Sequence, residues 1–223
     1  MQFDTSGGLF KICEWLYRLA YLNILAICFS LFGGILFGVF PAITAMFVLN
    51  NKWLKTKEDF SVSKEFWKAY KMYFLKSNLL GGVILLTMIA LYVDFSLIQN
   101  FNGVLYYLIL SSSATVLVLS VIVILHVFSL MTRYPKKSIF KLIRRAIQIS
   151  TLFPFLTLWM ALSMSSFLFI CLIIPGFAFL FLGSGISFLG MYFNHFIFKR
   201  IEEKNTIHSS VSIISERGAI HGK

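Results

Sequence analysis

The chain has 223 residues, of which 58% are hydrophobic and 13% are charged, and its formal net charge is +11. A water-soluble domain carries about 25% charged residues, so this composition excludes a soluble enzyme and a disordered segment. Multispanning membrane proteins carry an excess of Lys and Arg in their cytoplasmic loops, and this accounts for the positive net charge. We therefore expect no nucleic-acid partner. The sequence therefore predicts an all-α, multi-pass integral membrane protein.

Long apolar stretches, separated by polar or charged residues, predict the membrane helices. There are six: Tyr17 to Phe40, Pro41 to Leu54, Phe74 to Val93, Val104 to Leu130, Leu152 to Ile174 and Phe177 to Phe198. Each of the last four has at least about 20 residues, which at ~1.5 Å per residue crosses a hydrocarbon core of roughly 30 Å. These four are predicted as full spans.

The region from residue 17 to residue 54 is too long for one straight span and short for two. Helix-breaking glycines at and after Gly33 are followed by Pro41 in its middle, and proline is well tolerated in the first turn of a new helix. We therefore predict a hairpin with a short second helix, so that six helices enter the membrane. The runner-up is a single bent span, which gives five. The residues assigned to the turn and to helix packing are Gly38, Pro41, Thr44 and Ala45.

The basic residues predict which connections are cytoplasmic. Lys and Arg form four groups: two before residue 19, seven from Lys52 to Lys76, six from Arg133 to Arg145 and five from Lys199 onward. The connections at residues 94–103 and 173–176 contain neither, so they are predicted to lie outside. With six helices both termini are cytoplasmic, and with five the N-terminal group lies outside. We expect the protein in a bacterial cytoplasmic membrane.

Two basic amphipathic helices are predicted in the cytoplasmic connections, at about residues 62–75 and 138–149. Each has basic and apolar residues on different faces, runs directly into the next span, and in the second Ser138 is the expected N-cap. Their basic faces predict contact with anionic lipid headgroups, or a docking surface for a protein partner. The candidate contact residues are Lys64, Phe66, Trp67, Lys68, Tyr70, Lys71, Lys141, Arg144 and Arg145. Residues 1–200 form one transmembrane domain on this interpretation, and 201–223 a polar C-terminal tail.

Chemistry-bearing residues are sparse in the predicted spans. Asp94, His126 and His195 lie toward helix ends, whereas buried ionisable residues in a membrane mark transport or proton-transfer sites. Uncharged polar residues, among them Asn23 and Ser111 to Ser113, are expected to join helices by close packing and hydrogen bonds, or to line a polar path for a solute. Motifs for a nucleophile, a metal or a nucleotide do not occur. We therefore expect no enzymatic activity, cofactor or metal.

Several loose patterns follow one another in a distinctive order, most clearly along residues 10–85. They are Leu22-Asn23, then Pro41-Ala42-Ile43-Thr44-Ala45-Met46, then Lys57-Glu58-Asp59, then the aromatic and basic run from Glu65 to Phe74. In this order they resemble the YesL family of small bacterial multispanning membrane proteins.

That resemblance implies a protein without an assigned enzymatic activity, often encoded beside sugar importers of the ATP-binding cassette (ABC) type. It favours a non-enzymatic accessory protein in carbohydrate uptake, which contacts importer subunits or a second copy of itself. The alternative is a transporter or channel for a small solute in its own right.

Overall fold

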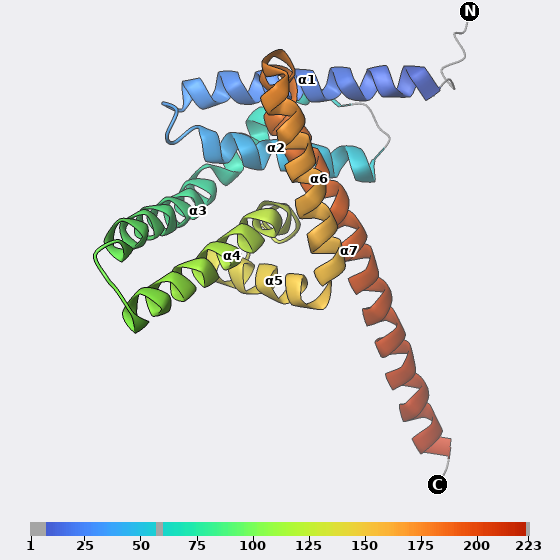
Figure 1. Cartoon of the computed structure of the whole chain (residues 1–223). Helices are drawn as coiled ribbons and strands as arrows, with labels where there is room; N and C mark the ends of the chain where they lie inside the picture. Colours follow the sequence, from blue (N-terminus) through green and yellow to red (C-terminus); the bar gives the residue numbers. More distant parts are fainter. Residues whose placement is uncertain (1–7, 57–59, 222–223) are drawn as a thin grey trace, which may run out of the picture.

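A computed structural model of the chain describes the backbone of residues 8–56 and 60–221, and the side chains of residues 10–56 and 60–203. Within these ranges the chain is all-helical, as the sequence predicts (Figure 1). The helices are α1 (Gly8–Phe32), α2 (Val39–Lys55), α3 (Val62–Ile98), α4 (Val104–Arg133), α5 (Ile139–Leu152), α6 (Pro154–Ile173) and α7 (Pro175–His221). The Lys57-Glu58-Asp59 pattern and the side chains of the tail beyond Glu203 lie outside the described residues.

Five helices are long and apolar enough to cross a membrane: α1, α3, α4, α6 and α7. The helix α2, with 17 residues, is not among them, because a full span needs about 20 residues. The long apolar stretches read from the sequence are thus confirmed as helices of membrane-spanning length. The second, short stretch forms a helix that does not reach this length alone.

The predicted hairpin between the first two helices is confirmed. Figure 1 shows α1 and α2 lying antiparallel, joined by a turn at residues 33–38. In this turn Gly34 and Ile35 have positive φ angles of 70° and 49°, a conformation that costs glycine little and other residues more. The helix α2 begins at Val39, two residues earlier than predicted. Pro41 still lies in its first turn, where a backbone N–H has no intrahelical partner.

Contacts between side chains fix the direction of each helix. We find that α2, α4 and α7 run one way and that α1, α3 and α6 run the other way. The contacts that establish this are Thr44 with Ser77 and Lys52 with Glu65 (α2 and α3), Met46 with Gly183 and Asn50 with Ser187 (α2 and α7), His126 with Asn194 and Arg133 with Glu202 (α4 and α7), and Met160 with Asn194 and Phe167 with Gly185 (α6 and α7).

The core has two parts. In one, α2 packs against α1 and the start of α3 around Leu22, Leu49 and Phe66. In the other, the end of α4 and the middle of α7 pack with α5 around Leu130, Leu142 and Ile197. The helix α2 is therefore surrounded by other helices for most of its length, and this burial supplies the stability that its short length does not.

The far half of α3 and the near half of α4 project away from this core (Figure 1). We call residues 82–97 and 104–120 the outer hairpin. None of these residues is buried, and Asp94 is the single Lys, Arg, Asp or Glu between Lys76 and Arg133. The outer hairpin thus presents a mostly apolar surface, as a membrane-embedded segment does.

The second basic amphipathic helix is confirmed as α5. It begins at Ile139 with Ser138 at the N-cap position, although the Ser138 side chain makes no capping hydrogen bond. Phe153 separates α5 from α6, which starts at Pro154. The first basic helix is continuous with its span, because α3 runs unbroken from Val62 to Ile98.

Candidate functional site

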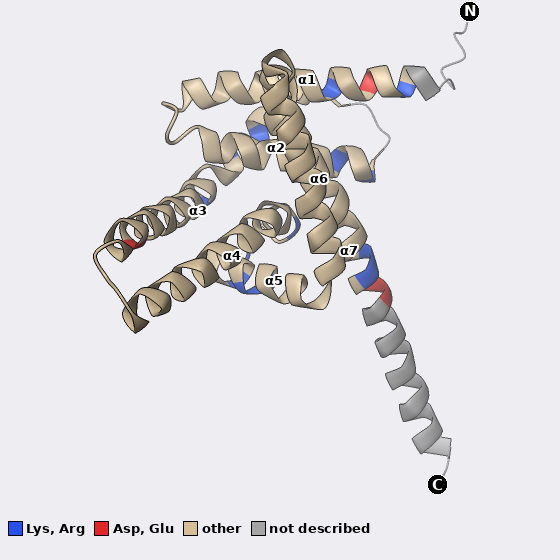
Figure 2. Cartoon of the chain, in the orientation of Figure 1, with Lys and Arg blue, Asp and Glu red and all other residues tan. Residues whose placement is uncertain are grey.

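The basic residues at the start of α3 lie on its exposed face. Lys64, Trp67, Lys68 and Lys71 are all exposed, and the Lys71 ammonium lies 4.3 Å from the centroid of the Trp67 ring. Figure 2 shows the basic residues away from the outer hairpin, in which an acidic residue is the single charge. These four side chains are accessible to a headgroup or a partner.

Two of the predicted contact residues on α3 are instead part of the core. Phe66 is fully buried and Tyr70 is 5% exposed, because the face of α3 that carries them is covered by α1. Their rings lie 5.2 and 5.5 Å from the ring of Phe29, and the Tyr70 hydroxyl donates to the Phe29 carbonyl at 3.2 Å. They hold α1 to α3 and are not available to a lipid or a partner.

The three candidate residues on α5 differ in their surroundings. Lys141 and Arg144 are exposed, whereas Arg145 is half-buried. The Arg145 guanidinium lies 4.4 Å from the centroid of the Tyr134 ring, and the Lys137 ammonium lies 4.8 Å from the same ring. Arg145 is therefore held in one place by a cation–π contact, and its two neighbours in the candidate set are not.

The residues predicted for the turn and for packing lie at close helix contacts. Gly38 faces the backbone of Ser30, and Pro41 and Ala45 are buried against neighbouring helices. The Thr44 hydroxyl is 2.8 Å from that of Ser77 on α3. All four belong to the hairpin core, so they act in folding.

A side chain of α1 is hydrogen-bonded to the backbone of α7. The Asn23 amide nitrogen donates to the Phe179 carbonyl at 2.7 Å, and its oxygen accepts from the backbone N–H groups of Gly183 and Ser184 at 3.1 and 3.2 Å. A methyl group on Gly183 would lie 2.9 Å from that oxygen. The glycine therefore permits the close approach that these three hydrogen bonds require.

Replacing Asn23 with leucine should loosen the attachment of α1 to α7. Three hydrogen bonds between the helices are lost, and we expect the free energy of unfolding to fall by roughly 1–3 kcal/mol. Thermal unfolding of the purified protein in detergent measures this. Thr115→Val is the control, since the Thr115 hydroxyl is bonded only to the Ser111 carbonyl of its own helix and should leave stability unchanged. Equal losses in both variants would contradict this role of Asn23.

A second polar cluster joins α4, α6 and α7. His126 is fully buried, with Nδ1 2.8 Å from Asn194 Oδ1 and Nε2 3.2 Å from the Thr157 hydroxyl. Because the Asn194 amide nitrogen donates to the Gly190 carbonyl at 2.8 Å, the Asn194 oxygen accepts from the His126 Nδ1–H. The Thr157 hydroxyl lies 3.2 Å from Nε2 and donates to the Phe153 carbonyl of its own helix at 3.1 Å. His126 is thus not merely an interfacial residue, because it links three helices in the interior.

Sequence reasoning missed several polar residues that make these contacts, among them Thr157 and Ser77. Asn50 donates to the Ser187 hydroxyl at 2.8 Å across the α2–α7 interface, and Ser184 and Asn194 take part in the clusters above. A signal was available: Gly183, Ser187, Gly190 and Asn194 are small or polar and repeat at helical spacing, so they share one face of α7. That face is where α2, α4 and α6 approach.

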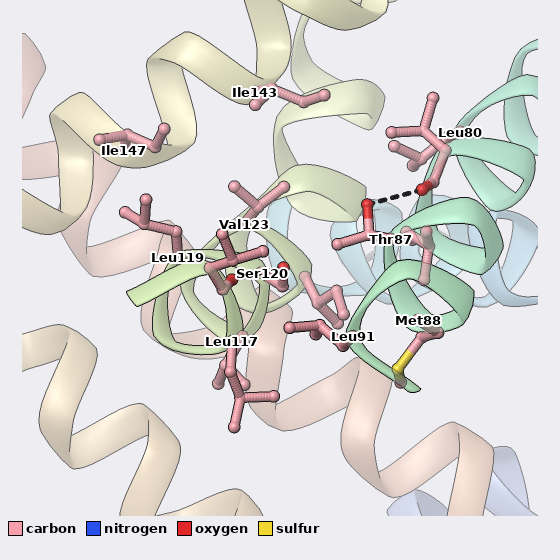
Figure 3. Close-up of a pocket in the computed structure, with 15 residues that line it drawn as sticks. Leu80, Thr87, Met88, Leu91, Leu117, Leu119, Ser120, Val123, Ile143 and Ile147 are labelled. Atoms are coloured by element: carbon pink, nitrogen blue, oxygen red, sulfur yellow. Dashed lines mark hydrogen bonds between the residues drawn. The ribbon is translucent and has the colours of Figure 1, made fainter. Parts of the chain in front are cut away.

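A groove runs between α3, α4 and α5 at the base of the outer hairpin. Figure 3 shows its lining, in which Leu80, Leu91, Leu117, Val123 and Ile147 surround the groove. Its hydroxyl groups, on Thr87 and Ser120, are hydrogen-bonded to carbonyls of their own helices. The groove suits an acyl chain or an apolar side chain and offers no catalytic group.

Among the residues that the structure describes, no group of three His, Cys, Asp or Glu side chains could hold a metal ion. The clusters around Asn23 and His126 are hydrogen-bonded contacts between helices. Together with five candidate spans, these features define a multi-pass helical membrane protein.

Comparison with known proteins assigns the family. The family described as "Protein of unknown function, DUF624" matches residues 19–95. Three similar proteins come from Bacillus subtilis (strain 168), and each is described as uncharacterized. YteU is 39% identical over 109 residues, which are 48% of this chain and 49% of YteU. YesL is 31% identical over 126 residues (56% of this chain, 60% of YesL), and YesV is 30% identical over 179 residues (79% of this chain, 84% of YesV). The chain belongs to the YesL family, which confirms the resemblance. The alignments span about half of YteU and three fifths of YesL. No solved structure matches the chain.

Proposed function

We propose that the protein is a non-enzymatic, multi-pass accessory protein of the bacterial cytoplasmic membrane, which supports carbohydrate uptake by lateral contact with an ABC-type sugar importer. The contact surface in this proposal is the outer hairpin. The exposed basic residues of α3 and α5 would rest on anionic headgroups of the cytoplasmic leaflet.

One observation carries this proposal: in the described part of the chain no residue of the outer hairpin is buried, although Ile84 at its base packs against the core. On α4 the hairpin exposes a group of small residues: Ser111, Ser112, Ala114 and Thr115. The three hydroxyl groups among them donate hydrogen bonds to carbonyls of their own helix. Small residues on a lipid-facing helix allow the backbone of another helix to come close. This surface therefore suits a transmembrane helix of a partner.

The proposed topology has both termini in the cytoplasm and α2 as a sixth, short membrane helix. The helix directions support it. Since α2, α4 and α7 run the same way, the basic residues that follow their apolar parts would lie toward the same face of the membrane: Lys52 and Lys55, Arg133, and Lys199 and Arg200. Burial of α2 among α1, α3 and α7 supports its place in the membrane despite its length. The link to sugar uptake is supported by what the YesL-family resemblance implies.

Affinity purification from native membranes tests the partner. We expect the membrane subunits of a sugar importer to be recovered with the wild-type protein, and the recovery to fall several-fold in the double variant S111F/T115F, whose bulky rings block close helix contact. Leu172→Phe is the matched control, since Leu172 is 80% exposed on α6. Recovery of importer subunits unaffected by S111F/T115F would exclude this surface. Recovery of the protein alone, with unchanged glycan uptake after deletion, would reject the accessory function.

A second candidate function is transport of a small solute by the protein itself. The observation that favours it is the buried cluster of His126, Asn194 and Thr157, because a titratable group inside a membrane bundle is often part of a solute or proton path. Flux of a solute through liposomes that contain only the purified protein would support transport. Such flux, lost in His126→Phe, would replace the accessory proposal.

A further inference from the structure

A pocket opens at the basic end of the bundle, where α4, α5 and α7 meet. Its volume is about 310 Å³, and its polar side chains include Arg133, Tyr134, Arg145 and Gln148. Its apolar wall is formed by Leu130, Ile149, Leu152, Phe198 and Ile201. The lining therefore combines cationic and apolar side chains, the two kinds of contact that the headgroup and the acyl chains of a phospholipid need.

The positive charges around this pocket exceed the negative charge within it. Arg133 is ion-paired with Glu202, the one carboxylate in the lining, and its guanidinium lies 4.5 Å from the Phe198 ring centroid. Arg145 and Lys137 both lie over Tyr134, and in the described part of the chain no ion pair joins Arg145 to a carboxylate. A guanidinium that is fixed in place and not neutralised favours a bidentate anion.

A fourth basic residue, Lys76, holds the backbone of this end in place. The Lys76 ammonium donates to the carbonyls of Pro135 and Lys137 at 2.8 and 2.6 Å. This joins α3 to the connection between α4 and α5. The pocket is therefore built on a connection that is tied to a neighbouring helix, so its geometry is set before a ligand arrives.

We propose that this pocket binds the phosphate headgroup of an anionic phospholipid, with Arg145 and Gln148 as donors to the phosphate and an acyl chain along Leu152 and Ile149. The site is specific: it lies between helices, whereas Lys141 and Arg144 on the exposed face of α5 meet headgroups only by general attraction. This inference does not depend on an importer partner.

Native mass spectrometry of the purified protein tests the site, with phosphatidylglycerol and phosphatidylcholine of identical acyl chains added in equal amounts. We expect the wild-type protein to retain more phosphatidylglycerol than phosphatidylcholine. Arg145→Gln should lower that retention about tenfold, the effect of losing ~1.4 kcal/mol from a charged hydrogen bond. The double variant K141Q/R144Q is the matched control: it loses more charge from the same helix and should retain the lipid as wild type does.

Each other outcome overturns the proposal. Equal retention of the two lipids by wild type, or equal losses in Arg145→Gln and K141Q/R144Q, would mean general surface attraction only. Displacement of the lipid by excess inorganic phosphate would mean a free-anion site. If Arg145→Gln does not fold, Arg145→Lys is compared with Arg144→Lys. The first should lower retention about threefold, because lysine keeps the charge and loses the planar fork, and unchanged retention in both would contradict the site.

Discussion

Replacing Asn194 with leucine is expected to lower the free energy of unfolding by roughly 1–3 kcal/mol, the cost of a buried polar group left without a partner. Leucine fills a similar volume but leaves the His126 Nδ1–H without its acceptor in the interior of the bundle. Unfolding of the purified protein in detergent, followed by circular dichroism as temperature rises, measures the loss.

Asn78→Leu is the matched control for this prediction. The Asn78 amide nitrogen is buried and has no hydrogen-bond partner among the described residues, so its replacement removes a cost that the native protein already bears. We expect stability to stay the same or to rise. If both leucine variants were destabilised equally, the effect would come from side-chain shape and not from the contact with His126.

A double variant separates the hydrogen bond from the packing. Replacing both partners, in H126F/N194L, removes the unpaired donor as well as its acceptor. The combined cost should therefore be smaller than the sum of the two single costs. Additive costs would contradict a direct hydrogen bond between these side chains.

The second large effect is expected from Gly38→Ala, at the turn between α1 and α2. A methyl group on Gly38 would meet the Ser30 carbonyl oxygen inside contact distance and would lie 2.8 Å from the Ser30 Cα. These are backbone atoms, which cannot move aside as the end of a side chain can, so the two helices must separate. We expect a loss of about 1–3 kcal/mol, typical of overpacking, measured by the same unfolding experiment.

Gly82→Ala provides the opposite case. Gly82 lies inside α3, and a methyl group there would meet nothing within 4 Å. Alanine is favoured over glycine in a helix by up to about 1 kcal/mol, so this variant should be as stable as wild type or more stable. A loss in Gly82→Ala similar to that in Gly38→Ala would show that the turn has no special need for glycine.

Much of the fold could be predicted because apolar length and helix-breaking residues are local properties. The break at Gly33 to Pro41, the helix after Ser138 and the long α3 all follow from residues close in sequence. What could not be predicted is which apolar face meets another helix and which meets lipid. Both environments are apolar, so hydropathy does not distinguish the buried Phe66 from the exposed Trp67.

The same limit applies to the candidate functional residues. The serines at residues 111–113 were expected to join helices or to line a path. Ser113 does donate to Asp94 on α3 at 3.2 Å, whereas Ser111 and Ser112 are exposed on the outer hairpin. Conversely, Asn194 lies next to His195 near a basic helix end, where sequence alone favours an interfacial position. Its burial depends on α4 and α6, which are distant in the chain.

The attachment of α1 and α2 to α7 has a consequence for the order of folding during synthesis. Asn23 and Asn50, in the first quarter of the chain, find their partners at Phe179, Gly183, Ser184 and Ser187, close to the other end. Until the ribosome has released α7, these two amides have no such partners in the membrane. The N-terminal hairpin therefore inserts early but reaches its final packing last, when the C-terminal helix arrives and closes the bundle.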